Sequence, residues 1–166
     1  MKKLVALLLA IVTLGAFCIS CGGANYKNDV PVTALMEKAT NTVPLSSGYA
    51  SGDSAYRDFK FKGISDITDQ YSISYSKDGR NINFIGIFRA KSASDAGSAA
   101  DICKTFLKNQ KKAFEDALAN YNPGEADKFD SAEVRTFGSY VVVVILTKSD
   151  AGKVFSSVES SLKIDK

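Results

Sequence analysis

Histidine and tryptophan are absent from this 166-residue chain, and cysteine and proline each occur only three times. Without histidine, the chain lacks the commonest general base and the commonest metal ligand of proteins. The sequence also contains no glycine-rich phosphate loop, no Gly-x-Ser-x-Gly nucleophile motif and no cluster with metal-ligand spacing. We therefore expect no metal and no cofactor, and the sequence favours a protein that is not an enzyme.

Two of the three cysteines, Cys18 and Cys21, follow a short basic start and an uncharged run from Leu4 to Phe17. That run is shorter than the ~20 apolar residues of a membrane span and is typical of a secretory signal peptide. Ser20 before Cys21-Gly22 resembles the lipobox of bacterial lipoproteins. We expect cleavage between Ser20 and Cys21 and a diacylglyceryl group on Cys21. An ordinary secreted protein cut elsewhere, or an uncut signal anchor, is the alternative.

This interpretation divides the chain into a signal peptide (1–20), a polar tether (21–30) and a single domain (31–166). Two acyl chains on Cys21 hold a protein on a bilayer durably, so we expect it on the outer face of a bacterial cytoplasmic membrane. Cleavage removes two of the 21 basic residues and none of the 18 acidic ones, so the net charge falls from +3 to +1. A charge this small gives no electrostatic support for nucleic-acid binding.

Hydrophobic periodicity predicts helices alternating with pairs of strands. The expected elements, in chain order, are a helix over 31–39, a loop over 40–54, helical turns within 59–70, strands over 71–75 and 81–90, a helix over 92–120, strands over 132–137 and 140–147, and a last helix. Ser94 or Asp95 would cap the long helix, and Ser149 or Asp150 the last one. The pattern predicts an α+β fold: a two-layer sandwich of a roughly four-stranded antiparallel sheet, made of two hairpins, with helices packed on one face.

Cys103 is the only thiol beyond the expected anchor, so the domain has no partner for an internal disulfide. It falls on the apolar side of the long helix. We expect a buried structural thiol, because a nucleophilic cysteine needs an activating neighbour.

Four motifs occur in a characteristic order over roughly residues 60–160: Phe88-Arg89-Ala90, Gln110-Lys111-Lys112-Ala113-Phe114, Gly138-Ser139-Tyr140-Val141, and the run from Asp150 to Phe155. In this the chain resembles the DUF4358 family of bacterial lipoproteins. The family commonly has an acidic residue where this chain has Asn83, so no role of that carboxylate carries over. The resemblance implies a lipid-anchored envelope domain of uncharacterised function, mostly in Gram-positive anaerobes, with a weaker link to membrane O-acyltransferases.

A row of lysines marks one side of the long helix: Lys104, Lys108, Lys111 and Lys112. Their spacing places them on one ridge, which could face anionic lipid headgroups or an anionic polymer of the envelope. The alternative is a solvated face with Lys111–Glu115 and Lys112–Asp116 pairs, and the near-zero charge favours it.

Two further residues could contact a ligand. Gln110 interrupts the apolar stripe of the long helix, where its amide would satisfy backbone groups or, less commonly, bind a ligand. Tyr140 could line a groove for a sugar or peptide, although a core position with the hydroxyl at the rim is more common for such a tyrosine.

The sequence thus favours a membrane-tethered, non-catalytic module that binds or scaffolds an envelope protein or polymer. One alternative is an accessory lipoprotein that binds a solute or glycan for a transporter or an O-acyltransferase. An enzyme that uses carboxylates or tyrosine is a third possibility.

Overall fold

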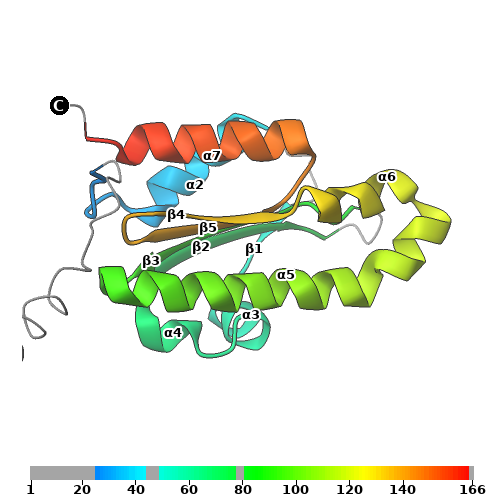
Figure 1. Ribbon diagram of the computed structural model, residues 1–166, viewed down its shortest axis with the longest axis horizontal. Coiled ribbons are helices and arrows are strands. Elements are labelled where there is room, and N and C mark those ends of the chain that lie inside the picture. Colours follow the sequence, from blue (N-terminus) through cyan, green and yellow to red (C-terminus); the bar gives the residue numbers. More distant parts are fainter. Residues whose placement is uncertain (1–24, 44–48, 78–80, 165–166) are drawn as a thin grey trace, which may run out of the picture.

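The computed structural model describes residues 25–43, 49–77 and 81–164. At its centre lies a five-stranded antiparallel sheet with the strand order β1-β2-β3-β5-β4 (Figure 1). The strands are β1 (Tyr49–Ser51), β2 (Thr68–Ser76), β3 (Phe84–Ala90), β4 (Glu133–Phe137) and β5 (Tyr140–Ile145). Antiparallel pairing of β2 with β3 and of β4 with β5 matches the two predicted hairpins.

Helices cover both faces of this sheet (Figure 1). They are α2 (Val32–Asn41), α3 (Ser54–Lys60), α4 (Ile64–Ile67), α5 (Ala93–Tyr121), α6 (Pro123–Ala126), the 3-10 helix η1 (Asp127–Asp130) and α7 (Lys148–Leu162). Helices α2 and α7 lie on one face, and α3, α4 and α5 on the other. The predicted α+β sandwich is confirmed, but the predictions of four strands and of helices on one face are wrong.

The burial of β5 explains why one helical layer is not enough. Its side chains alternate between the faces, yet all six residues are buried. Val142 and Val144 pack toward α2 and α7, whereas Val141 and Val143 pack toward α5. A strand that is apolar at every position needs cover on both faces.

The fifth strand, β1, lies inside the segment predicted as a loop. Its three residues pair with the end of β2, with Tyr49 opposite Ser76 and Ala50 opposite Tyr75. Three residues are too few to show an alternating pattern, so the pairing depends on contacts distant in sequence.

The capping residues of both long helices lie earlier in the chain than predicted. The Ser92 hydroxyl accepts a hydrogen bond from the Asp95 N–H (3.2 Å), and the Thr147 hydroxyl accepts one from the Asp150 N–H (3.2 Å). Each hydroxyl lies three residues before the donor, the usual geometry of an N-cap. The predicted caps therefore lie inside the first turn of their helices.

Helix α5 buries only its first half. Cys103 and Phe106 are buried against the sheet, and burial raises the pKa of the Cys103 thiol well above its usual value. Beyond them, Ala113 is exposed and Phe114 is 43% exposed, because the helix runs past the sheet (Figure 1). Within the described ranges, no helix combines the length and the apolar character needed to cross a membrane.

Residues 25–30, predicted as part of a tether, pack against the domain. The Lys27 N–H donates to the Leu162 carbonyl (2.7 Å), and Tyr26 forms a β-bridge with Lys163. The Tyr26 ring also meets Phe137 edge-on at 5.7 Å between centroids. These contacts place residues 25–30 in the folded domain rather than in a tether; residues 21–24 lie outside the described residues.

Candidate functional site

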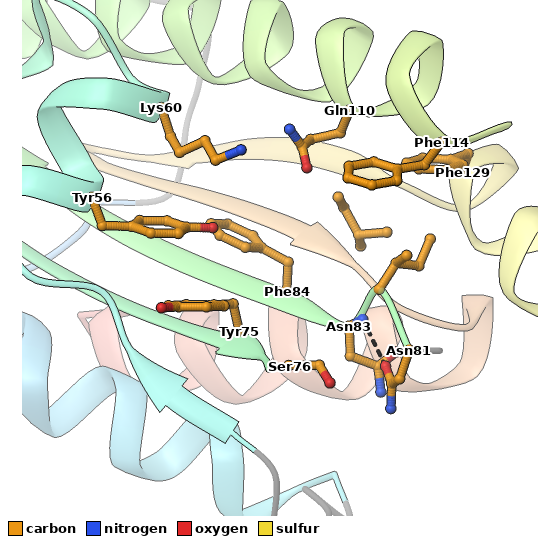
Figure 2. A pocket seen from close by; sticks show the side chains of 12 residues that line it. Tyr56, Lys60, Tyr75, Ser76, Asn81, Asn83, Phe84, Gln110, Phe114 and Phe129 are labelled. Carbon is orange, nitrogen blue, oxygen red and sulfur yellow. Dashed lines mark hydrogen bonds between the residues drawn. The ribbon is translucent and has the colours of Figure 1, made fainter. Parts of the chain in front are cut away.

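One cavity in the described part of the chain combines aromatic walls with polar groups that have no partner. It measures about 210 Å³ and lies between α3, α5 and the facing ends of β2 and β3 (Figure 2). Its lining residues are Tyr56, Lys60, Tyr75, Ser76, Asn81, Ile82, Asn83, Phe84, Gln110, Phe114, Phe129 and Ile145. We call this cavity the Tyr56 pocket.

Five of the twelve residues that line the Tyr56 pocket are aromatic. Tyr56 from α3 stacks on Tyr75 from β2, with ring centroids 4.4 Å apart and an interplanar angle of 13°. Figure 2 shows Lys60 on the opposite side of the Tyr56 ring from Tyr75. One face of Tyr56 is thus occupied by Tyr75, and the other faces the pocket.

The polar ends of Lys60 and Gln110 point toward each other across the pocket (Figure 2). Lys60 makes no ion pair among the described residues; its ammonium lies 5.5 Å from the centroid of the Phe59 ring. The Gln110 amide is half-buried and has no hydrogen-bond partner in the same ranges. Both side chains are partly exposed in the cavity, so their polar ends are available to a ligand or to ordered water.

The Tyr56 hydroxyl is a hydrogen-bond donor at physiological pH. Burial, together with the nearby Tyr75, raises the pKa of Tyr56 to about 12. A phenol with this pKa is too weak an acid to serve as a proton shuttle near neutrality, but it donates readily to an acceptor.

A buried ion pair holds the rim of the pocket. The Lys128 ammonium contacts Glu125 at 2.5 Å and donates to the Asn83 side-chain oxygen at 2.6 Å. Glu125 in turn accepts a hydrogen bond from the Ile82 N–H (2.9 Å). The Lys128 and Glu125 side chains are 9% and 16% exposed, so this cluster fixes the start of β3 against α6 and η1.

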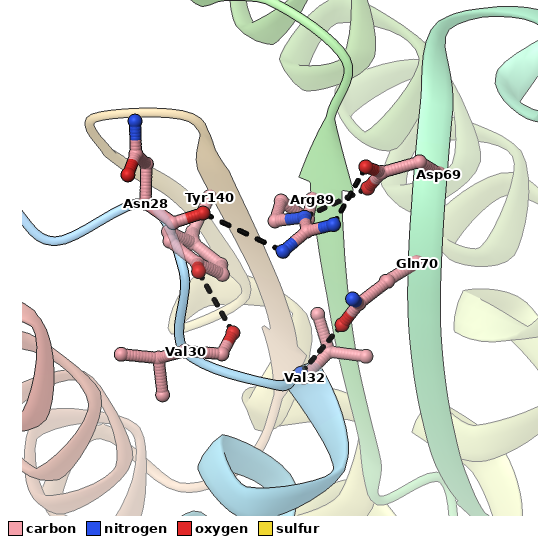
Figure 3. Close-up of polar contacts among 7 residues, drawn as sticks. All are labelled: Asn28, Val30, Val32, Asp69, Gln70, Arg89 and Tyr140. Carbon is pink, nitrogen blue, oxygen red and sulfur yellow. Dashed lines mark hydrogen bonds and ion pairs between the residues drawn. The ribbon is translucent and has the colours of Figure 1, made fainter.

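The opposite end of the molecule carries a second polar cluster (Figure 3). Arg89 binds both carboxylate oxygens of Asp69, at 2.8 and 2.6 Å, and donates to the Asn28 carbonyl at 3.5 Å. The Tyr140 hydroxyl donates to the Val30 carbonyl (2.7 Å). These bonds hold residues 28–30, where the chain enters the domain, against the sheet.

Tyr140, predicted as a possible contact for a partner, is 0% exposed and belongs to the core beneath α2 and α7. Its ring cannot line a groove, because it packs inside the sheet–helix interface. Its hydroxyl donates to the Val30 carbonyl of the entering chain and also lies beside the Arg89 guanidinium.

The predicted lysine strip is partly used in ion pairs. Lys104 contacts Asp101 at 2.8 Å, and Lys111 contacts Asp130 at 3.2 Å. Lys108 and Lys112 are exposed on α5. The side chains of Glu115 and Asp116, the expected partners in the alternative interpretation, lie outside what the structure describes.

Of the predicted ligand-contact residues, the structure places only Gln110 in the Tyr56 pocket. Sequence reasoning missed Tyr56 and Lys60, which come from a seven-residue helix without a strong pattern. Ser20 and Cys21, the expected cleavage and lipidation site, lie outside the described residues.

Three other hollows are larger, at about 430 to 470 Å³. In the one at Arg89, the charged groups Arg89 and Asp69 pair with each other, and the buried Ser139 hydroxyl has no described hydrogen-bond partner. In the described ranges, no three acidic, cysteine or histidine side chains gather as metal ligands would.

Comparison with known proteins finds no family model, no curated protein and no solved structure that matches this chain. The resemblance to DUF4358 therefore stays a prediction.

Proposed function

We propose that this chain is a membrane-anchored, extracytoplasmic binding protein without catalytic activity, and that its binding site is the Tyr56 pocket. The observation that carries the proposal is that Lys60 and Gln110 line a partly aromatic cavity and make no ion pair or hydrogen bond with the described residues. Ligand sites commonly combine apolar walls with a few polar groups of this kind. A defined pocket favours a ligand over a flat scaffolding surface.

The size of the pocket limits what it can hold. Sites for drug-sized molecules enclose roughly 300–1,000 Å³, whereas the Tyr56 pocket encloses about 210 Å³. It therefore suits a single ring, or one end of a longer envelope molecule whose remainder stays in solvent.

The proposed lipid on Cys21 would turn the pocket away from the membrane. Three residues separate Cys21 from Asn25, so these four residue steps span at most about 14 Å. The chain enters the domain beside the start of α5, since Tyr26 and Ala93 line the same hollow. Gln110 lies 17 residues further along α5, about 25 Å at 1.5 Å per residue. Material from the envelope could thus reach the pocket.

Thermal unfolding in the presence of a soluble digest of bacterial cell envelope tests the binding site. A ligand at 100 times its dissociation constant stabilises the native state by about 2.7 kcal/mol. We expect stabilisation of the wild type and none of Gln110→Trp, whose indole would fill the cavity. Lys108→Trp, on the exposed side of the same helix, is the matched control and should behave as wild type. Equal responses from all three proteins would refute the site.

Mass spectrometry of the membrane fraction tests the anchor. The wild type should yield a lipid-modified peptide that begins at Cys21, and Cys21→Ala should lose both the modification and membrane retention. Protein recovered from the medium with an unmodified amino terminus would refute the anchor and indicate a diffusible, secreted protein.

A further inference from the structure

We infer that the Tyr56 pocket selects a small organic anion, with a flat apolar body on the Tyr56 ring and a single carboxylate or similar group held by Lys60. This inference rests on the proposed function, because it names the chemical class that the same site takes.

The charge of the pocket comes from one side chain. Lys60 is the only charged residue among its described lining residues, and no carboxylate lines it. The neighbouring cation on α3, Arg57, is already paired with Asp58 at 2.7 Å. Lys60 instead has only the Phe59 ring beside it. A ligand anion supplies the missing counter-charge, whereas a cationic ligand is repelled.

Two further polar groups over the pocket, the Gln110 amide and the Tyr56 hydroxyl, can donate to an anion. The Gln110 amide offers two N–H donors, and the Tyr56 hydroxyl stays protonated at physiological pH. Neither has a hydrogen-bond partner among the described residues. Hydrogen bonds from such donors to a carboxylate are roughly twice as strong as bonds between neutral groups.

The walls favour a flat apolar body. The free face of Tyr56 offers a stacking surface, and Phe84, Phe114 and Phe129 complete the enclosure. A neutral sugar could also stack on Tyr56, but it carries hydroxyls around its whole rim. The hydroxyls that would face the phenyl and isoleucine side chains find no hydrogen-bond partner there, so burying them carries a cost.

A pair of indole probes separates charge from shape. Indole-3-acetate and indole-3-acetamide share one ring and nearly one size, and only the first is an anion. Because the chain has no tryptophan, probe fluorescence can be excited beyond the tyrosine absorption band without a protein background. Fluorescence anisotropy then gives both dissociation constants directly on the purified chain.

We expect indole-3-acetate to bind at least about tenfold more tightly than indole-3-acetamide, the size of one hydrogen bond to a charged group. Lys60→Met should remove that difference and leave the melting temperature nearly unchanged, because Lys60 makes no described ion pair. Lys62→Met, two residues along and outside the pocket lining, is the matched control and should keep the full preference.

Equal binding of the two probes overturns the inference, and so does a preference that survives Lys60→Met or that Lys62→Met also abolishes. Stabilisation by methyl glucoside without binding of either indole would assign a neutral sugar instead. If neither probe binds while the envelope digest still stabilises wild type but not Gln110→Trp, the anion assignment fails and the proposed function stands. Loss of that stabilisation as well would refute both.

Discussion

The two ends of this molecule use their polar side chains in opposite ways. Where the chain enters, Arg89, Asp69 and Tyr140 each have a partner, and together they fasten residues 28–30 to the sheet (Figure 3). At the other end, Lys60 and Gln110 face a cavity and make no ion pair or hydrogen bond with the part of the chain that the structure describes (Figure 2). Paired groups of the first kind stabilise the fold, whereas unpaired groups in a cavity contribute little to it and are available for recognition.

A buried ion pair nevertheless holds the rim of the pocket end. Breaking this ion pair should give the largest loss of stability. Glu125→Gln would leave the buried Lys128 ammonium without its counter-charge. Removing one partner of a buried ion pair typically costs about 3 kcal/mol or more, so we expect that loss in the free energy of unfolding by urea. Glu133→Gln, in an exposed pair with Arg135, should cost less than about 0.5 kcal/mol. Similar losses in the two variants would contradict a buried pair.

A pair of tyrosine variants compares the two ends directly. Tyr140→Phe removes the donor to the Val30 carbonyl and should destabilise by about 1–2 kcal/mol. Tyr56→Phe removes a hydroxyl that has no described partner and should change the stability by less than about 0.5 kcal/mol. Chemical denaturation of both variants checks this, and a larger loss from Tyr56→Phe would reverse the assignment of the two ends.

Acid should weaken the entering end through Asp69. Hydrogen bonds from Arg89 lower the pKa of Asp69 below its usual value near 3.8. A lowered folded-state pKa contributes stability above the usual value and loses it as the pH falls through the folded-state pKa. The advantage of wild type over Asp69→Asn should therefore shrink below about pH 4. Since Asp69 is 40% exposed, we expect under about 1 kcal/mol. Asp101→Asn, in the exposed pair with Lys104, is the control. An advantage of wild type over Asp69→Asn that does not change with pH would contradict this account.

Gln110→Leu should have the smallest effect on stability and a large one on binding. Its amide has no described partner, so the free energy of unfolding should change by less than about 0.5 kcal/mol or rise slightly. Ligand-induced stabilisation should fall in the same protein. A loss above about 1 kcal/mol would mean that the amide holds the fold.

The sequence predicts the strands and long helices because their patterns are local. The uniform apolar run of β5 also implied two covered faces, although the sandwich was predicted with one. Strand β1 and the packing of Tyr26 carry no local pattern, since both depend on partners distant in sequence, Ser76 and Lys163.

The site was predictable only where it interrupts a pattern. Gln110 breaks the apolar stripe of α5, and that break is visible in the sequence. Tyr56 and Lys60 lie on a short helix, and only tertiary packing brings them to α5 and β2. Tyr140 was a candidate because an aromatic side chain on a sheet face can line a groove, but helices cover that face, and its ring is buried.

Hydrogen exchange followed by mass spectrometry, with and without the envelope digest, tests most directly whether the unpaired end is the binding end. The account predicts slower exchange in peptides that contain Tyr56, Phe84 and Gln110, with no change in peptides around Val30 and Tyr140. Slower exchange around Val30 and Tyr140, or no change in either region, would contradict it.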